Sequence, residues 1–208
     1  MAVELVAQGR GATLSQLTYL LVSGPDQEAA VAASCAASDA GEAANMAQQV
    51  AACMAKGVIA AVDDGDAERV AAVNAALVAR ERVDVCRRLA VAIVDAQRDD
   101  ALGAVSWSAL QQKQPNTVVA LGATLIVHGE LHAASAANVA LMRAAGGPAA
   151  VAGPAAGAVV KACVDGAHCN AARLTMLLLH VCWLDWWIDQ LRAHNGCVRM
   201  FCTNPGVA

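Results

Sequence analysis

Apolar residues in this chain recur every three to four positions, and no segment alternates between apolar and polar residues as a strand does. This spacing matches the turn of an α-helix, whereas a half-buried strand needs a period of two. Alanine, the best helix former, supplies roughly a quarter of the residues. The length of 208 residues suits one domain. The sequence therefore predicts an all-α fold: a single globular domain over 1–208, built as a bundle of about eight helices.

Turn and cap residues divide the chain into segments. We expect helices at 14–22, 26–56 (with a break near Ser38-Asp39 and a stop at Gly57), 66–98, around Trp107, 117–145, 170–192 and 196–202. The helix that starts near Thr117 begins apolar on nearly every side, which is typical of a central helix wrapped by others. Residues 146–157 form an internal loop rich in Ala, Gly and Pro. We find no internal repeat at the periods of helical solenoids.

The charge distribution argues against nucleic acid as a partner. The formal net charge is −4. Phosphate binding needs clustered cations, and the densest group of arginines, interrupted by Glu81 and Asp84, is predicted to be the solvated face of a helix. That group consists of Arg80, Arg82, Arg87 and Arg88.

No signal peptide, membrane span or tail anchor is seen, so we expect an intracellular, cytoplasmic protein and leave membrane association open. Without secretion the eight cysteines need not pair, and their apolar contexts favour small buried hydrophobes.

Catalytic and cofactor sites are not predicted. His128 and His132 are four residues apart, but Gly129 stands where a zinc protease has its glutamate, and a third ligand is lacking. Asp63, Asp64 and Asp66 surround Gly65 without the distal ligands of a calcium loop, so they indicate a helix start. Phosphate-binding glycine motifs are absent. We expect no metal, no cofactor and no enzymatic activity.

The C-terminal segment carries a resemblance to a known family. Trp187-Ile188, the turn Asn195-Gly196, and the apolar Val198 and Phe201 resemble the second homology region of the B-cell lymphoma two family of apoptosis regulators. Upstream, Arg88 to Val91 and Ser106-Trp107 resemble the approach to the family's Asn-Trp-Gly-Arg signature.

The upstream match departs from that signature. Ser106 replaces Asn, Ser108 replaces Gly, and Ala109 replaces the Arg that pairs with the ligand's Asp. Lys113 is the candidate to replace that cation. The resemblance spans residues 88–201, and such erosion is typical of diverged viral members.

The resemblance implies an anti-apoptotic protein that binds an amphipathic death-motif helix of pro-apoptotic proteins in a hydrophobic surface groove, and it implies localisation to the mitochondrial surface through those partners. Candidate residues of the groove and its floor are Leu89, Ile93, Trp107, Val118, Val119 and Leu121. Trp187, Gly196 and Phe201 would support its far end. The alternative is a structural or assembly protein, for example a viral virion subunit, in which the same apolar faces make oligomer contacts. A monomer favours the groove, and a large defined oligomer favours assembly.

Overall fold

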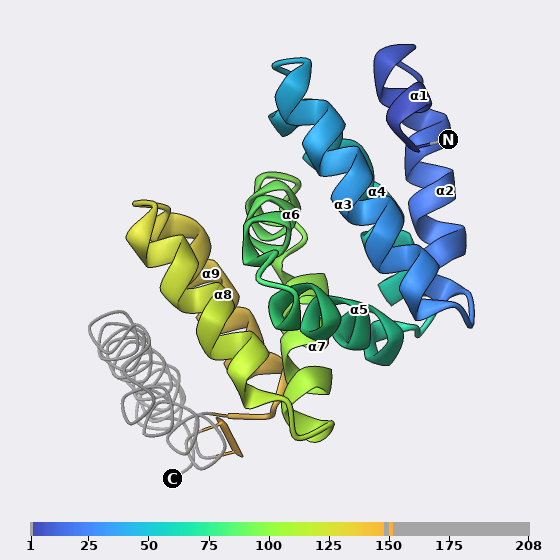
Figure 1. The fold of residues 1–208 in the computed structure, drawn as a ribbon. Coiled ribbons are helices and arrows are strands. Elements are labelled where there is room, and N and C mark those ends of the chain that lie inside the picture. The colour runs from blue at the N-terminus through green and yellow to red at the C-terminus, as the bar shows by residue number, and fades with distance from the viewer. Residues whose placement is uncertain (1, 148–149, 152–208) are drawn as a thin grey trace, which may run out of the picture.

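A computed structural model describes residues 2–147 and 150–151, and these residues form helices joined by short turns (Figure 1). The all-α prediction is confirmed, because the described residues contain nine helices and no strand. None of these helices is long and apolar enough to cross a membrane. The helices are α1 (Ala2–Ala7), α2 (Gly11–Ser23), α3 (Gln27–Ala43), α4 (Ala47–Asp63), α5 (Ala67–Ala79), α6 (Val83–Asp95), α7 (Asp99–Gln111), α8 (Pro115–Val127) and α9 (Leu131–Ala144).

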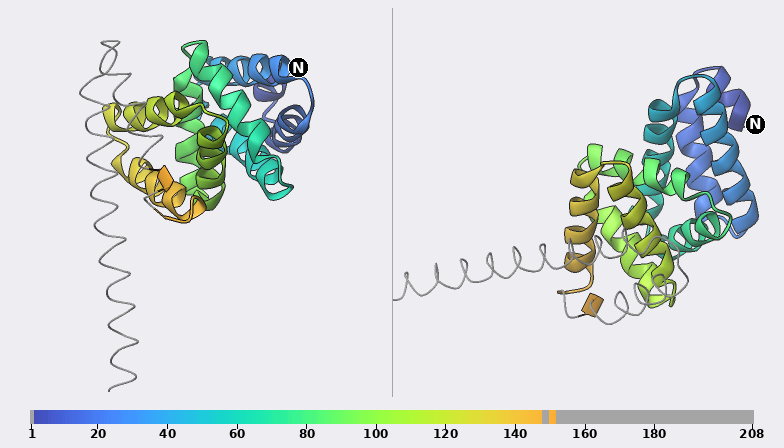
Figure 2. Two further views of the ribbon diagram at one scale, coloured as in Figure 1. Left: turned by 90° about the horizontal axis from the view of Figure 1, so that it is seen from below. Right: turned by 60° about the vertical axis from the view of Figure 1, so that its left-hand side comes forward.

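The described helices follow one another through space in chain order. Each packs against the next helix and against the next but one, and every substantial contact joins helices no more than three places apart. Both views in Figure 2 accordingly place α1 to α3 at one end and α8 and α9 at the other. Contacts of this kind are typical of helical repeat proteins, in which each unit touches only its neighbours.

The apolar helix near Thr117 is α8, but it does not occupy the centre of the described helices. It packs against α5, α6, α7 and α9, and Val127 at its end is 68% exposed. Its apolar residues serve two separate clusters: Leu121 and Leu125 belong to the main core, and Val118 also packs against a smaller cluster. This double duty explains why the helix is apolar on several sides. The helices with the most neighbours are α5, which packs against α2, α3, α4, α6, α7 and α8, and α6, which packs against α3, α4, α5, α7, α8 and α9.

A 16-residue repeat runs through the second half of the described chain, contrary to our prediction that none exists. Helices α5, α6, α7, α8 and α9 begin at residues 67, 83, 99, 115 and 131. Each of these helices follows a short turn in which one residue has the left-handed conformation. The residue four positions before that left-handed residue is buried in all five cases: Ala61, Leu77, Ile93, Ala109 and Leu125. Two helices therefore make a unit of 32 residues, close to the unit lengths of helical solenoids.

The repeat is built on one turn conformation. In the turn before each of these helices a single residue adopts positive φ, namely Gly65, Glu81, Gln97, Lys113 and Gly129. In every turn the next N–H donates to a carbonyl five residues back; Arg98, for example, donates to Ile93 at 3.1 Å. This pattern is the Schellman motif, which satisfies the free carbonyls at a helix end. Glycine usually holds the left-handed position, and three of the five turns here lack it, which hides the repeat in the sequence.

The segments predicted as single helices at 66–98 and 117–145 are each divided by one of these turns, into α5 and α6 and into α8 and α9. Two predicted boundaries within 26–56 were also wrong. Helix α3 continues through Ser38-Asp39 to Ala43, and the break comes at Asn45, another residue with positive φ. Helix α4 continues through Gly57, which does not end the helix. Gly57 instead allows α4 to approach α2 closely, because a Cβ there would lie 2.4 Å from the carbonyl oxygen of Ser15.

The predicted loop at 146–157 is described only in part. Gly146 and Gly147 lie in a turn, and Ala150 and Val151 are helical. The remaining residues of that range, and the helices predicted at 170–192 and 196–202, lie outside the described residues.

Candidate protein-binding site

Helix α2 has one face bound to the body of the protein. Leu14, Thr18 and Val22 are spaced by four residues and are all buried against the neighbouring helices. Gly57 of α4 lets the two backbones approach closely at the middle of α2. The buried face of α2 is therefore fully used by intramolecular packing.

Hydrogen bonds fix α2 along its length. The Ser15 hydroxyl donates to the Cys53 carbonyl at 2.7 Å, and the Tyr19 hydroxyl donates to Asp64 Oδ2 at 2.8 Å. This bond to the Asp64 carboxylate raises the pKa of Tyr19 above its ordinary value. At the end of the helix, Arg69 donates to the Ser23 carbonyl. Because these contacts run from one end of α2 to the other, α2 is a rigid platform.

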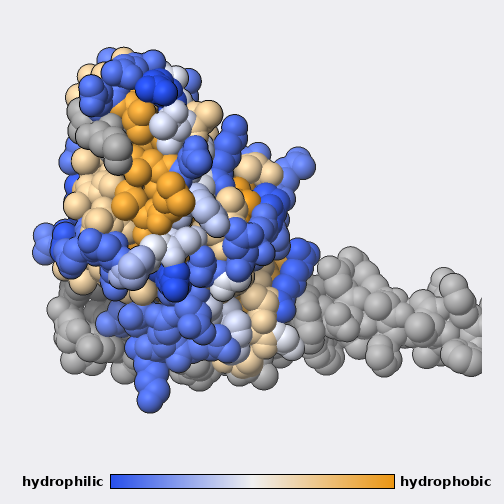
Figure 3. All heavy atoms as spheres, turned by 90° about the vertical axis from the view of Figure 1, so that its right-hand side faces the viewer, coloured by the Kyte–Doolittle hydropathy of each residue, from blue (hydrophilic) through white to orange (hydrophobic). Residues whose placement is uncertain are grey.

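Beside this buried face α2 carries a stripe of leucines, Leu17, Leu20 and Leu21, with helical spacing of three and four. Leu20 is 58% exposed, and Leu17 and Leu21 are partly buried. Figure 3 faces this end of the molecule and shows an apolar patch bordered by polar side chains. We call Leu17, Leu20 and Leu21 the α2 stripe. A rigid apolar stripe of this kind suits contact with another protein.

The surface beside the stripe is slightly hollowed. Leu17 and Leu21 line a cavity of about 10 Å³ together with Ala33 of α3 and Met54 of α4. Such a volume holds about one water molecule, so the hollow is no small-molecule pocket. The described cavities around α4 and α6 and around Arg10 are equally small, about 10 and 20 Å³.

Comparisons with known proteins add no family. Protein-family models, curated proteins and solved structures give no match to this chain.

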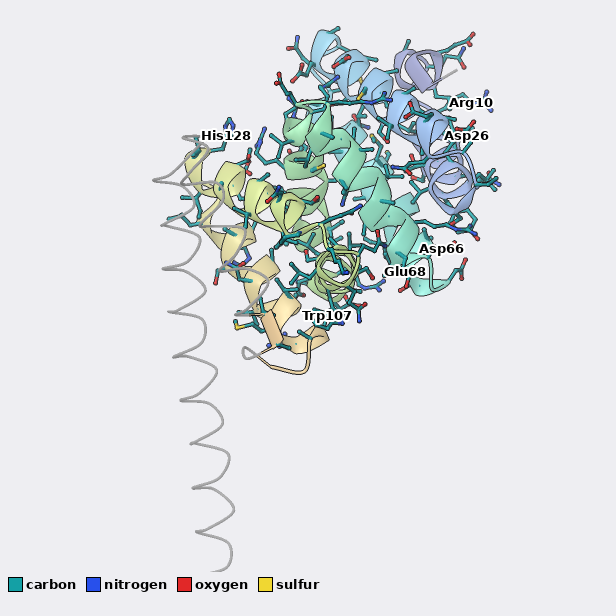
Figure 4. All side chains as sticks on the ribbon, turned by 60° about the horizontal axis from the view of Figure 1, so that its bottom comes forward. Arg10, Asp26, Asp66, Glu68, Trp107 and His128 are labelled. Atoms are coloured by element: carbon teal, nitrogen blue, oxygen red, sulfur yellow. The ribbon has the colours of Figure 1, made fainter. Side chains whose placement is uncertain are left out.

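The residues predicted to line a groove lie mostly inside the protein. Leu89 and Ile93 of α6 and Leu121 of α8 meet in the main core, each less than one tenth exposed. Val119 is also buried. Trp107 and Val118 are only partly buried and border the smaller cluster, and Figure 4 shows Trp107 on α7. The structure thus brings Leu89, Ile93 and Leu121 together as core packing, and Leu89 also lines a cavity of about 10 Å³, about the volume of one water molecule.

Neither position considered for the cation that would pair with the Asp of a death motif, Ala109 or Lys113, is shown to provide it. Ala109 is 1% exposed, so an arginine at this position would have to enter the core. Lys113 lies in the turn after α7, where its φ is +60°. Trp187, Gly196 and Phe201 fall outside the described residues, so their supporting role stays a prediction.

The histidines and carboxylates show no catalytic arrangement in the described part. His128 and His132 are both exposed, and no group of three metal-ligating side chains occurs among the described residues. Figure 4 shows His128 on the side of the molecule opposite Arg10. Asp66 directly precedes α5, as expected for a helix start. Asp63 and Asp64 accept hydrogen bonds from Arg98 and Tyr19.

The arginine group at 80–88 is not simply a solvated face. Its four side chains form ion pairs with carboxylates on other helices: Arg80 with Glu28, Arg82 with Asp39, Arg87 with Glu130 and Arg88 with Glu42. These pairs tie α5 and α6 to α3 and to the start of α9. Since every cation of the group already has a carboxylate, the group offers no free basic stripe for phosphates.

Cys86 fits the prediction of a small buried hydrophobe. It is 3% exposed, and burial raises the pKa of its thiol to about 12. A thiol with such a pKa is almost fully protonated at neutral pH and is a poor nucleophile.

Sequence reasoning missed the α2 stripe although its spacing was visible. The spacing predicts a helix with an apolar face, but it does not say which apolar residues have neighbours. Only the packing of α2 against α4 separates Leu14 and Val22, which are covered, from Leu20, which is not.

Proposed function

We propose that this chain is a protein-binding module that holds an amphipathic helix of its partner against the α2 stripe. The observation that carries the proposal is the exposure of Leu20, flanked by Leu17 and Leu21, on a helix whose other face is fixed by packing and hydrogen bonds. A partner helix with apolar residues at the same spacing would bury these leucines. The fixed platform lowers the entropy lost on binding.

The narrower hypothesis, that the partner is a pro-apoptotic protein and the bound helix its death motif, stays a prediction based on the sequence resemblance. The buried positions of Leu89, Ile93 and Leu121 lend it no support, because these residues have no free surface for a ligand. If a death-motif helix binds, we expect it on the α2 stripe.

Peptide titration of the full chain tests the proposal. Labelled amphipathic helical peptides, death-motif peptides among them, are titrated and followed by fluorescence anisotropy. We expect at least one to bind with micromolar affinity and Leu20→Arg to weaken that binding at least tenfold, about 1.4 kcal/mol. The matched control is Leu131→Arg, because Leu131 is 57% exposed at the other end of the described chain. The proposal fails if no peptide binds at micromolar concentrations, or if both variants weaken binding equally.

The assembly alternative is favoured by one observation, the linear order of the helices. A linear array has two ends, and an apolar end surface can join copies into larger structures. A large defined oligomer in sedimentation velocity, abolished by Leu20→Arg, would support assembly as the function.

A further inference from the structure

Charges of opposite sign lie at the two ends of the α2 stripe. Arg10 precedes the first residue of α2, and Asp26 follows its last residue by three positions. Both side chains are exposed, and Figure 4 shows both on the same outer side of the molecule. The stripe is therefore apolar in the middle, positive at one end and negative at the other.

Arg10 has no ion-pair or side-chain hydrogen-bond partner among the described residues, unlike the arginines of α5 and α6. The Asp26 carboxylate accepts one bond, from the N–H of Ala29, at 3.0 Å, and forms no ion pair within residues 2–147. Its second oxygen can accept a further donor. Each end of the stripe thus presents an uncompensated charge.

Resting on the function proposed above, we infer that the amphipathic helix bound by the α2 stripe is α2 of a second copy of this chain, packed antiparallel. A two-fold axis across the middle of α2 would lay the leucines of one copy on those of the other. Residues 10 and 26 lie at equal distances in sequence from residue 18, so the same axis places Arg10 of each copy opposite Asp26 of its partner. A two-fold interface must be complementary to itself in this way.

The position of α2 in the array gives a second reason. Each helix from α3 to α7 has described neighbours two places behind and two places ahead along the chain. Among the described residues, helix α2 has α4 two places ahead of it and no helix two places behind it. The α2 of a second copy would supply a helix of matching length and spacing at that position.

The interface is small, so the dimer is weak. One 13-residue helix with three leucines falls below the roughly 800 Å² per partner of a standard interface. We expect a dissociation constant in the micromolar range. The two charge pairs fix the antiparallel direction and make association weaker as salt concentration rises.

Sedimentation velocity of the full chain, over a concentration series from about 1 to 200 μM, tests the inference. We expect a monomer–dimer equilibrium that Leu20→Arg shifts at least tenfold toward monomer and Leu131→Arg leaves unchanged. Arg10→Asp and Asp26→Arg should each weaken dimerisation at least tenfold, because each brings like charges together twice. An equimolar mixture of these two single variants should dimerise again, since each Asp then faces an Arg.

The mixture also controls for the helix cap that Asp26→Arg removes, because the cap stays lost while association returns. The inference is wrong if the wild type stays monomeric throughout the series, or if the mixture fails to associate. It is also wrong if Leu20→Arg dimerises like the wild type. If the sedimentation experiment fails but a peptide binds in a Leu20-dependent way, the proposed function still stands and only the dimer is wrong. If the sedimentation and the peptide experiments both fail, the dimer and the proposed function are both wrong.

Discussion

The first four helices and the last five use different geometry to bring next-but-one neighbours together. Helices α2 and α4 run parallel: Ser15 near the start of α2 bonds the Cys53 carbonyl, and Tyr19 further along bonds Asp64 just past the end of α4. Helices α7 and α9 run antiparallel, because Gly103 lies against Ala140 and Arg143 lies 3.7 Å from Asp99. Helices α5 and α7 are antiparallel too, with Gln112 donating to the Glu68 carbonyl at 2.9 Å.

The turns explain the difference. In the repeat, three residues with one left-handed conformation join helices of 13 or 14 residues. Two such turns together reverse the chain, so each rotates it by roughly a right angle, as in helix-turn-helix units. In the first region the turn between α3 and α4 has the same conformation, with Asn45 left-handed, but α2 and α3 are joined by residues 24–26 with Gly24 extended, and α3 and α4 have 17 residues each. Helix α2 keeps an outer face without a described neighbour, which exposes Leu20, whereas the exposed apolar residues of the repeat, Val127 and Leu131, lie on either side of the turn between α8 and α9.

The largest expected effect tests what the two regions share, a glycine at the closest helix crossing. Adding a Cβ at Gly57 or at Gly103 would bring it to 2.4 Å from a backbone oxygen, of Ser15 or of Ala140. Both Gly57→Ala and Gly103→Ala should therefore destabilise by at least about 2 kcal/mol in urea unfolding. The control is Gly129→Ala, where nothing lies within 4 Å and only the φ of +76° is strained. A loss at Gly57 or Gly103 no larger than this control's, about 1 kcal/mol or less, would contradict the close crossings.

Much of the fold could be predicted from the sequence, and the missing parts share one cause. Helical spacing and high alanine content predicted the fold class, and Pro115 with the apolar run after it located the start of α8 to within two residues, although the helix was predicted to continue to 145 and ends at Val127. The turns at Glu81, Gln97 and Lys113 were not predictable from residue type, because these side chains rarely adopt positive φ. Gly129 did carry a readable stop signal, which the continuous apolar pattern around it obscured.

The site was less predictable than the fold. Leu89, Ile93 and Leu121 are residue types that could form the floor of a groove, but they are buried as core residues are. The spacing of apolar residues in the sequence does not distinguish a groove floor from a core. Exposure of the α2 stripe depends on which helices lie two places away, a long-range property that no local pattern encodes.

A smaller change in the free energy of unfolding is expected from a substitution that affects only the repeat. Gln97 holds the left-handed position of the turn between α6 and α7 with φ of +58°. Gln97→Gly should relieve this strain and stabilise the protein by about 0.5 kcal/mol, after the entropy cost of glycine. Ala96→Gly is the matched neighbour, because Ala96 has a φ of −79° and gains nothing. If both variants lose stability equally in urea, the left-handed turn is absent.

The smallest expected effect concerns the ion pairs that join the two regions. Arg98 donates to Asp63 at the end of α4 and to Asp100 at the start of α7, and these bonds hold the pKa of both carboxyls below the ordinary 3.8. A lowered folded-state pKa stabilises the fold above the ordinary value, and this contribution is lost as the pH falls through the lowered pKa. Arg98→Gln should slightly lower the free energy of unfolding at pH 7 and make no difference at about pH 2. A difference as large at pH 2 as at pH 7 would show that Arg98 acts by packing.

An NMR titration tests directly whether the α2 stripe is the binding surface. Leucine-methyl NMR spectra of the full chain are recorded during titration with a synthetic peptide of this chain's residues 9–26. We predict concentration-dependent shifts of the methyl signals of Leu17, Leu20 and Leu21. The methyl signals of Leu131, which is as exposed as Leu20 but lies in the repeat, should not change. Shifts centred on leucines of α5 to α9, or no shifts up to several hundred micromolar peptide, would contradict this prediction.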